Sequence, residues 1–150
     1  MSSATHTVNI HRVLRASPEK VYRAFLEPDA FAKWVPPHGF TGKVHQMDVR
    51  VGGKYRMSFT NLSTTKRHSV GGTYLELTPY ESIKKADSNE APNLSGEILV
   101  SVSLMPAACG SELHITQEGL PENIPVEFCY LGWQESLRQL AHLVEPVSPD

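Results

Sequence analysis

The chain lacks the features that mark several specialised protein classes. Its only cysteines, Cys109 and Cys129, form no C-x-x-C pattern, so we expect two reduced thiols rather than a disulfide framework. No apolar run approaches the roughly 18 residues of a transmembrane helix. Residues 1–7 have neither the basic nor the apolar region of a secretory signal. These absences predict a cytoplasmic protein.

An excess of charge of one sign is also missing. Fourteen Lys and Arg residues against sixteen Asp and Glu residues give a net charge of −2. A nucleic-acid surface is usually strongly basic, and an electrostatic membrane anchor needs a polybasic segment. We therefore expect neither nucleic acid nor a membrane as a partner.

What the chain does have is the composition of one ordinary globular domain. It is 40% apolar and 20% charged over 150 residues. A chain of this length can bury roughly two-thirds of its unfolded surface without a disulfide or a metal. We expect a single domain over residues 1–150, with an ordered core from about residue 7 to residue 146 and a frayed tail beyond it.

The N-terminal part predicts a strand followed by two short helices. Residues 7–14 alternate between apolar and polar side chains, as a half-buried strand does. Ser17, Pro18 and Glu19 then supply an N-cap, a proline at the first helical position and an acid in the first turn. Pro28 starts a second helix, which Pro36-Pro37 ends.

Residues 42–117 show the period of two that is typical of strands. Gly52-Gly53 predicts a hairpin turn between strands at 44–51 and 54–60, and Gly71-Gly72 predicts a bulge in a strand at 70–78. The polar segment 82–93 is predicted to be a weak edge strand that runs into a loop. Strands at 97–104 and 112–118, joined by a turn at 106–110, complete a predicted antiparallel sheet.

The last predicted element is a long amphipathic helix from Pro125 to about Glu145, stopped by Pro146. Its apolar stripe consists of Val126, Cys129, Tyr130, Trp133, Leu137, Leu140, Ala141 and Val144. The expected solvent face carries Gln134, Glu135, Arg138, His142 and Glu145. Because the stripe and the apolar face of the sheet must cover each other, the pattern predicts an α+β fold.

Four segments resemble one known family: WVPPHGF at 34–40, DVRVGGKYR at 48–56, GTYLEL at 72–77 and GWQESL at 132–137. They resemble the domain related to the activator of heat-shock-protein-90 ATPase, within the START-like and polyketide cyclase (SRPBCC) superfamily, over about residues 8–144. The resemblance implies a helix-grip fold of the START-like, Bet v-like kind. In this fold a curved antiparallel sheet wraps around a long C-terminal helix, and two short helices follow the first strand. It also implies an elongated cavity for apolar or amphipathic small molecules. Related domains carry an apolar strand after the position of Pro79, whereas this chain reads SIKKAD at 82–87.

Motifs for metal, cofactor or hydrolytic chemistry are missing. The seven histidines form no H-E-x-x-H motif, and no two lie four residues apart on a predicted helix, so we expect scattered surface imidazoles and no metal. The chain also contains no G-x-S-x-G elbow and no G-x-G-x-x-G loop. We therefore predict no cofactor and assign no catalytic residue.

The candidate ligand-binding residues come from separate elements that this fold would bring together. Each could instead fill the core, and we expect Cys129 to be a small buried apolar residue rather than a nucleophile. The candidates are Trp34, Met57, Phe59, Tyr74, Gln117, Cys129, Tyr130 and Trp133.

Polar residues on the predicted inner faces offer acid–base chemistry. The candidates are Arg12, Gln117 and Glu118, although Glu118 could equally accept hydrogen bonds from the loop before the last helix. Asp48 and Arg50 share one face beside the hairpin, where we expect a local ion pair.

Three functions stay open from the sequence. The leading hypothesis is a protein that binds a small hydrophobic or amphipathic molecule between the sheet and the last helix. A cyclase, an aromatase or a hydrolase could use the same cavity, so the sequence leaves open whether the protein is an enzyme. A co-chaperone-like interaction domain ranks last, because such domains typically stand beside a second one. The sequence also leaves a homodimer open.

Overall fold

The computed structural model describes residues 5–89 and 97–146. The loop expected around residues 90–93 and the tail expected after Pro146 lie outside the described residues. The elements in chain order are β1 (Thr5–Leu14), α1 (Pro18–Leu26), α2 (Pro28–Trp34), β2 (Phe40–Met47), β3 (Lys54–Asn61), β4 (Arg67–Thr78), β5 (Ser82–Asn89), β6 (Ile98–Ala107), β7 (Gly110–Pro121) and α3 (Val126–Val144).

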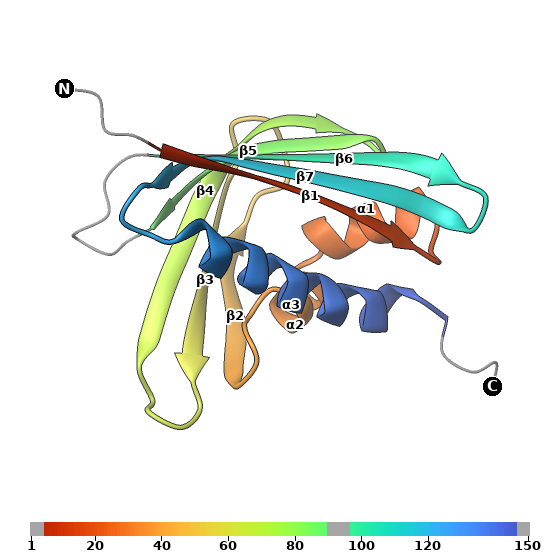
Figure 1. Cartoon of the computed structure of the whole chain (residues 1–150). Helices are drawn as coiled ribbons and strands as arrows, with labels where there is room; N and C mark the ends of the chain where they lie inside the picture. The colour runs from red at the N-terminus through yellow and green to blue at the C-terminus, as the bar shows by residue number, and fades with distance from the viewer. Residues whose placement is uncertain (1–4, 90–96, 147–150) are drawn as a thin grey trace.

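The strands form one antiparallel sheet in the order β1-β7-β6-β5-β4-β3-β2. Its curvature brings the two ends of the sheet around α3, which crosses the inner face, while α1 and α2 lie beside it (Figure 1). The register shifts at His6/Thr7, Val44/Gln46 and Tyr74/Glu76, and each such irregularity bends and twists a sheet locally. The α+β helix-grip prediction is confirmed.

The predicted starts of the first two helices are confirmed. The Ser17 hydroxyl accepts a hydrogen bond of 3.2 Å from the Lys20 backbone N–H, and Pro18 and Pro28 are the first residues of α1 and α2. None of the helices within residues 5–89 and 97–146 combines the length and the apolar character that a membrane crossing requires.

The two halves of α3 have different surroundings. The C-terminal half packs into the core through Leu137, Leu140, Ala141 and Val144, which are all buried. In the N-terminal half, Cys129, Tyr130 and Trp133 stay partly exposed. The apolar stripe is therefore used for core packing along only part of its length.

Side chains beside the stripe tie α3 to the segment after α2. Gln139 Nε2 donates to the carbonyl oxygens of Trp34 at 2.7 Å and Pro36 at 2.8 Å. The Glu135 carboxylate accepts a hydrogen bond from the His38 backbone N–H, and Glu145 accepts one of 2.9 Å from the Arg15 N–H. The expectation that Glu135 and Glu145 face only solvent is therefore wrong, because the segments after β1 and after α2 bring backbone donors to them.

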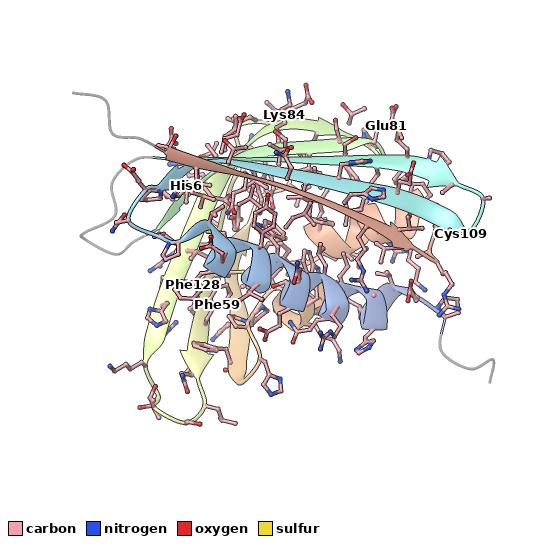
Figure 2. The ribbon with its side chains drawn as sticks, in the orientation of Figure 1. His6, Phe59, Glu81, Lys84, Cys109 and Phe128 are labelled. Atoms are coloured by element: carbon pink, nitrogen blue, oxygen red, sulfur yellow. The ribbon has the colours of Figure 1, made fainter. Side chains whose placement is uncertain are left out.

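The polar segment after Pro79 is the largest departure from the sequence-based expectation. The prediction of an edge strand is wrong, because β5 lies at the centre of the sheet, paired with β4 and β6. Its inward residues Ile83 and Lys85 are buried, whereas Lys84 stands on the outer face (Figure 2). The polar composition misled the prediction because one of these lysines points into the protein.

The two glycine pairs also act differently from expectation. The irregularity in β4 falls between Tyr74 and Glu76 rather than at Gly71-Gly72. A Cβ on Gly72 would lie 2.5 Å from the Ala86 carbonyl oxygen and 2.7 Å from Asp87 Oδ1, so this glycine permits close strand approach rather than a bulge. The strand before Gly52 ends at Met47, not at Val51, and residues 48–53 form the turn, in which Gly52 has φ +84°.

Candidate functional site

A pocket of about 350 Å³ lies between the inner face of the sheet and the N-terminal half of α3, and we call it the central pocket. Helices α1 and α2 and strands β3 to β7 all contribute to its wall. Its lining residues are Phe25, Phe31, Trp34, Val35, Pro37, Tyr55, Met57, Val70, Lys85, Asp87, Ser88, Ile98, Val100, Gln117, Leu120, Phe128, Cys129, Gly132, Trp133 and Ser136. Most of these side chains are apolar or aromatic, and eight of the twenty carry a nitrogen or oxygen atom.

Five of the eight candidate residues meet in this wall: Trp34, Met57, Gln117, Cys129 and Trp133. The other three lie elsewhere. Tyr74 is buried in the core, where its ring lies 5.7 Å from that of Tyr55. Phe59 packs at the edge of the core, and Tyr130 lines a separate small groove between β1 and α3.

A charged cluster that the sequence did not reveal stands in the pocket wall. Tyr55 Oη donates a hydrogen bond of 2.6 Å to Asp87 Oδ1, and Lys85 Nζ donates one of 3.3 Å to Tyr55 Oη. Nζ also lies 3.7 Å from Asp87 Oδ2, and the side chains of Lys85 and Asp87 are only 9% and 24% exposed, respectively. Lys85 and Asp87 are two residues apart in β5, so their side chains lie on the same face of the sheet. Tyr55 lies on β3, and β4 pairs with both strands and separates them.

Aromatic rings surround the Lys85 ammonium. Nζ lies 4.5 Å from the centroid of the Tyr55 ring and 5.0 Å from that of Phe31, so both ring faces stabilise its positive charge. Burial, and after it the negative charge of Asp87, raises the pKa of Tyr55 well above its ordinary value. Tyr55 is therefore a proton donor to Asp87 at neutral pH rather than a phenolate.

The signal that could have found this cluster was the period of two in β5. Ile83, Lys85 and Asp87 share parity, and Ile83 is the obvious core residue. Gly72 was a second signal, because a Cβ there would meet Asp87 Oδ1 at 2.7 Å and Tyr55 Cε1 at 3.0 Å. The glycine on β4 thus makes room for two members of the cluster.

Gln117 and Trp133 form a second polar contact in the wall. Trp133 Nε1 donates a hydrogen bond of 2.9 Å to Gln117 Oε1, which joins α3 to β7. Cys129, one turn earlier on α3, lines the same pocket, and its burial raises the pKa of the thiol. A less acidic thiol holds less thiolate at neutral pH and is a weaker nucleophile.

The acid–base candidates from the sequence do not converge. Glu118 is exposed and does not line the central pocket. Arg12 lines the groove between β1 and α3, and its Nε has no hydrogen-bond partner among the described residues. Arg50 Nε donates to Asp48 Oδ2 at 2.7 Å, so this ion pair forms, but within the turn rather than on a strand face.

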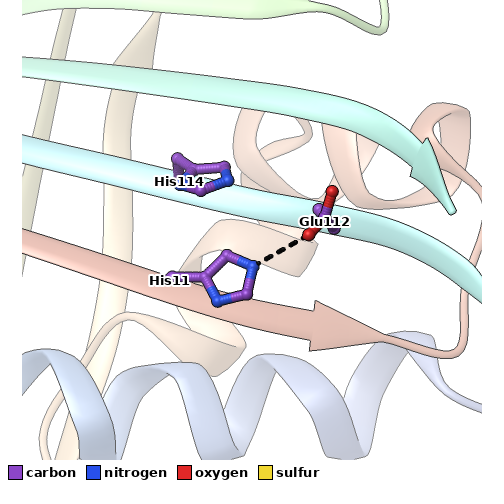
Figure 3. A group of neighbouring side chains, drawn as sticks. All are labelled: His11, Glu112 and His114. Carbon is purple, nitrogen blue, oxygen red and sulfur yellow. Dashed lines mark hydrogen bonds and ion pairs between the residues drawn. The ribbon is translucent and has the colours of Figure 1, made fainter.

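Two histidines and a glutamate meet on the outer face of the sheet (Figure 3). His11 pairs with His114 across β1 and β7, with ring centroids 4.6 Å apart, and His11 Nε2 lies 3.2 Å from Glu112 Oε1. One ligand atom from each residue lies within 4.8 Å of the others, so the three could hold a divalent cation. The expectation of scattered imidazoles is therefore wrong here. The His11–Glu112 bond already pairs two of the three atoms, and we assign no ion to the group.

Comparison with known proteins agrees with this architecture. A protein of known structure from Chromobacterium violaceum is 52% identical, with a TM-score of 0.91, over 94% of this chain and 98% of that chain. The AHSA1-like protein from Aeromonas hydrophila shares the fold at 16% identity, with a TM-score of 0.78 over 91% of this chain and 90% of its own. No curated protein matches the chain. Residues 15–145 match the model of the family described as Activator of Hsp90 ATPase homolog 1-like protein, and the chain therefore belongs to that family.

Proposed function

We propose that the protein binds a small amphipathic molecule in the central pocket. The observation that carries the proposal is a pocket of about 350 Å³ whose wall is mainly apolar and aromatic and includes the Tyr55–Lys85–Asp87 cluster. Small-molecule sites have this composition, with an apolar lining and a few placed polar groups. A cytoplasmic location, which fits two free cysteines, is part of the proposal.

The use of α3 supports the same function. A helix built only for core packing would bury its apolar stripe along its whole length. Here the buried stripe residues lie in the C-terminal half, whereas Cys129 and Trp133 in the N-terminal half line the pocket. Apolar surface that is not used for packing is available to a ligand.

Gly132 offers a test that does not weaken the fold. It lies within α3, it lines the pocket, and a Cβ built on it meets nothing within 4 Å. Gly132→Leu places a larger side chain at the pocket, and Gly132→Ala serves as the matched control. Both substitutions favour the helix, since glycine costs about 1 kcal/mol relative to alanine in a helix interior.

The experiment is calorimetric titration of the purified chain with 2-naphthol, an amphipathic probe, accompanied by thermal unfolding of each variant. We expect saturable binding to the wild type and to Gly132→Ala, and loss of binding in Gly132→Leu with an unfolding temperature that is not lowered. Absence of saturable binding to the wild type would refute the proposal. Undiminished binding to Gly132→Leu would place the ligand elsewhere.

A further inference from the structure

The charges in the wall of the central pocket cancel. Among the described residues that line it, only Lys85 and Asp87 are charged, and their charges are opposite. They lie 3.7 Å apart and are largely buried. A ligand with a net charge would add an unpaired charge to this mainly apolar site, which is strongly unfavourable. The pocket is therefore matched to a ligand without net charge.

Lys85 has hydrogen-bonding capacity that the protein does not use. An ammonium group has three N–H donors. Within the part of the chain that the structure describes, Nζ has one hydrogen-bond acceptor, Tyr55 Oη at 3.3 Å. Asp87 Oδ2 at 3.7 Å lies beyond hydrogen-bond distance, and the rings of Phe31 and Tyr55 are no substitute for an oxygen acceptor. A ligand oxygen would complete the coordination of this buried ammonium.

The hydrogen bonds available at Tyr55 and Asp87 indicate which kind of ligand oxygen fits beside Lys85. The Tyr55 hydroxyl has one proton, which it donates to Asp87 Oδ1 in a hydrogen bond of 2.6 Å, so it cannot donate to a ligand. The Asp87 carboxylate keeps acceptor capacity at its second oxygen. A hydroxyl group can accept from Lys85 and donate to Asp87 at once, whereas a carbonyl oxygen or an ether can only accept.

From this geometry we infer that the central pocket selects an uncharged, mainly apolar molecule whose single hydroxyl group binds between Lys85 and Asp87. The inference rests on the proposed binding function and specifies the chemical class of its ligand. It assigns Lys85 and Asp87 as the residues that determine specificity, and the aromatic wall as the surface that holds the apolar body.

Three compounds with one ring system test the inference: naphthalene, 2-naphthol and 2-naphthoate. They offer the pocket no polar group, a neutral hydroxyl and a carboxylate, respectively. In calorimetric titrations of the full chain at pH 7, 2-naphthol is expected to bind about tenfold more tightly than naphthalene, the gain that a hydrogen bond to a charged donor supplies. The carboxylate is expected to bind no more tightly than naphthalene.

The triple variant Tyr55→Phe/Lys85→Met/Asp87→Leu removes both charges together, leaves neither one buried alone, and leaves no Tyr55 hydroxyl free to bond a ligand. It should lose the preference for 2-naphthol, so that 2-naphthol and naphthalene bind to it with equal dissociation constants. Lys84→Met is the matched control, because Lys84 is exposed on the opposite face of the same strand (Figure 2). This control should leave all three dissociation constants unchanged.

The outcomes separate this inference from the function on which it rests. Tighter binding of 2-naphthoate than of 2-naphthol, or a hydroxyl preference that persists in the triple variant, overturns the inference. Binding of naphthalene without any preference for 2-naphthol overturns it too, but leaves the proposed function standing. If none of the three compounds binds, both fail.

Discussion

The indole N–H of Trp133 donates a hydrogen bond of 2.9 Å to the side-chain oxygen of Gln117. This bond joins the N-terminal half of α3 to β7 in the wall of the central pocket. The C-terminal half of the helix is held by buried apolar side chains and by the hydrogen bonds of Gln139 to the carbonyl oxygens of Trp34 and Pro36. One polar contact therefore contributes to the position of the half-helix that faces the pocket.

Gln117→Leu should destabilise the protein by about 1 kcal/mol, because the partly buried indole N–H loses its acceptor. The Trp133 emission maximum should move to shorter wavelength, since an apolar side chain replaces an amide. Urea unfolding and fluorescence spectra of the folded state measure the two effects. Glu118→Leu places the same side chain at the neighbouring exposed position of β7 and is the control, which should change neither quantity. Unchanged stability and emission in Gln117→Leu would show that the bond has no structural role.

Lys85→Met alone should lower the free energy of unfolding by about 3 kcal/mol, because it leaves the Asp87 charge partly buried without its counter-charge. Adding Asp87→Leu should recover most of that loss, since replacing a buried ion pair with apolar side chains is often neutral or stabilising. Urea unfolding of both single variants and the double variant gives the coupling energy. If the double variant were less stable than either single one, the effect would come from packing rather than from charge.

The raised pKa of Tyr74 should lower the free energy of unfolding at alkaline pH. Burial, and after it the charge of Asp87, raises the pKa of Tyr74 above its ordinary value. Above about pH 10 a tyrosine in the unfolded chain loses its proton while folded Tyr74 keeps it. The unfolded state then binds fewer protons, so the free energy of unfolding decreases as pH rises.

Tyr74→Phe should therefore flatten the decline of stability between pH 10 and pH 12 by up to about 1.4 kcal/mol per pH unit. Urea unfolding across this range measures the slope for both proteins. Between pH 7 and pH 9 the difference in stability between them should stay constant. Identical slopes above pH 10 would contradict the assignment.

The two thiols should differ in reactivity. Cys109 is exposed in the turn between β6 and β7 (Figure 2), whereas Cys129 lines the pocket and burial raises the pKa of its thiol. A colorimetric disulfide reagent should therefore modify Cys109 first and Cys129 more slowly. Saturating 2-naphthol should slow the second phase and leave the first unchanged.

Cys109→Ser and Cys129→Ser assign the two phases of thiol modification. Each variant should keep the rate of the remaining cysteine. Equal protection of both thiols would point to a global change in stability rather than to occupation of the pocket.

The amino-acid sequence by itself determined the elements and the fold class. Local signals such as the Ser17 N-cap, the prolines that start α1 and α2, and the stripe of α3 act over a few residues, so they can be identified without a structure. The family motifs and these signals together predicted a curved sheet around a helix, and five of the candidate residues line the pocket in the structure.

Only the tertiary structure decided which side chains share the polar part of the pocket. Tyr55 and Asp87 lie on strands separated by β4, and β5 is central only because β4 and β6 pair on either side of it. The neighbours of β5 in the sheet are also its neighbours in the chain, but whether a strand is paired on both sides depends on those other segments, and the periodicity of the strand itself does not encode it. The same polar composition that predicts an exposed edge strand therefore becomes, between two paired neighbours, a buried lysine and aspartate facing an apolar pocket.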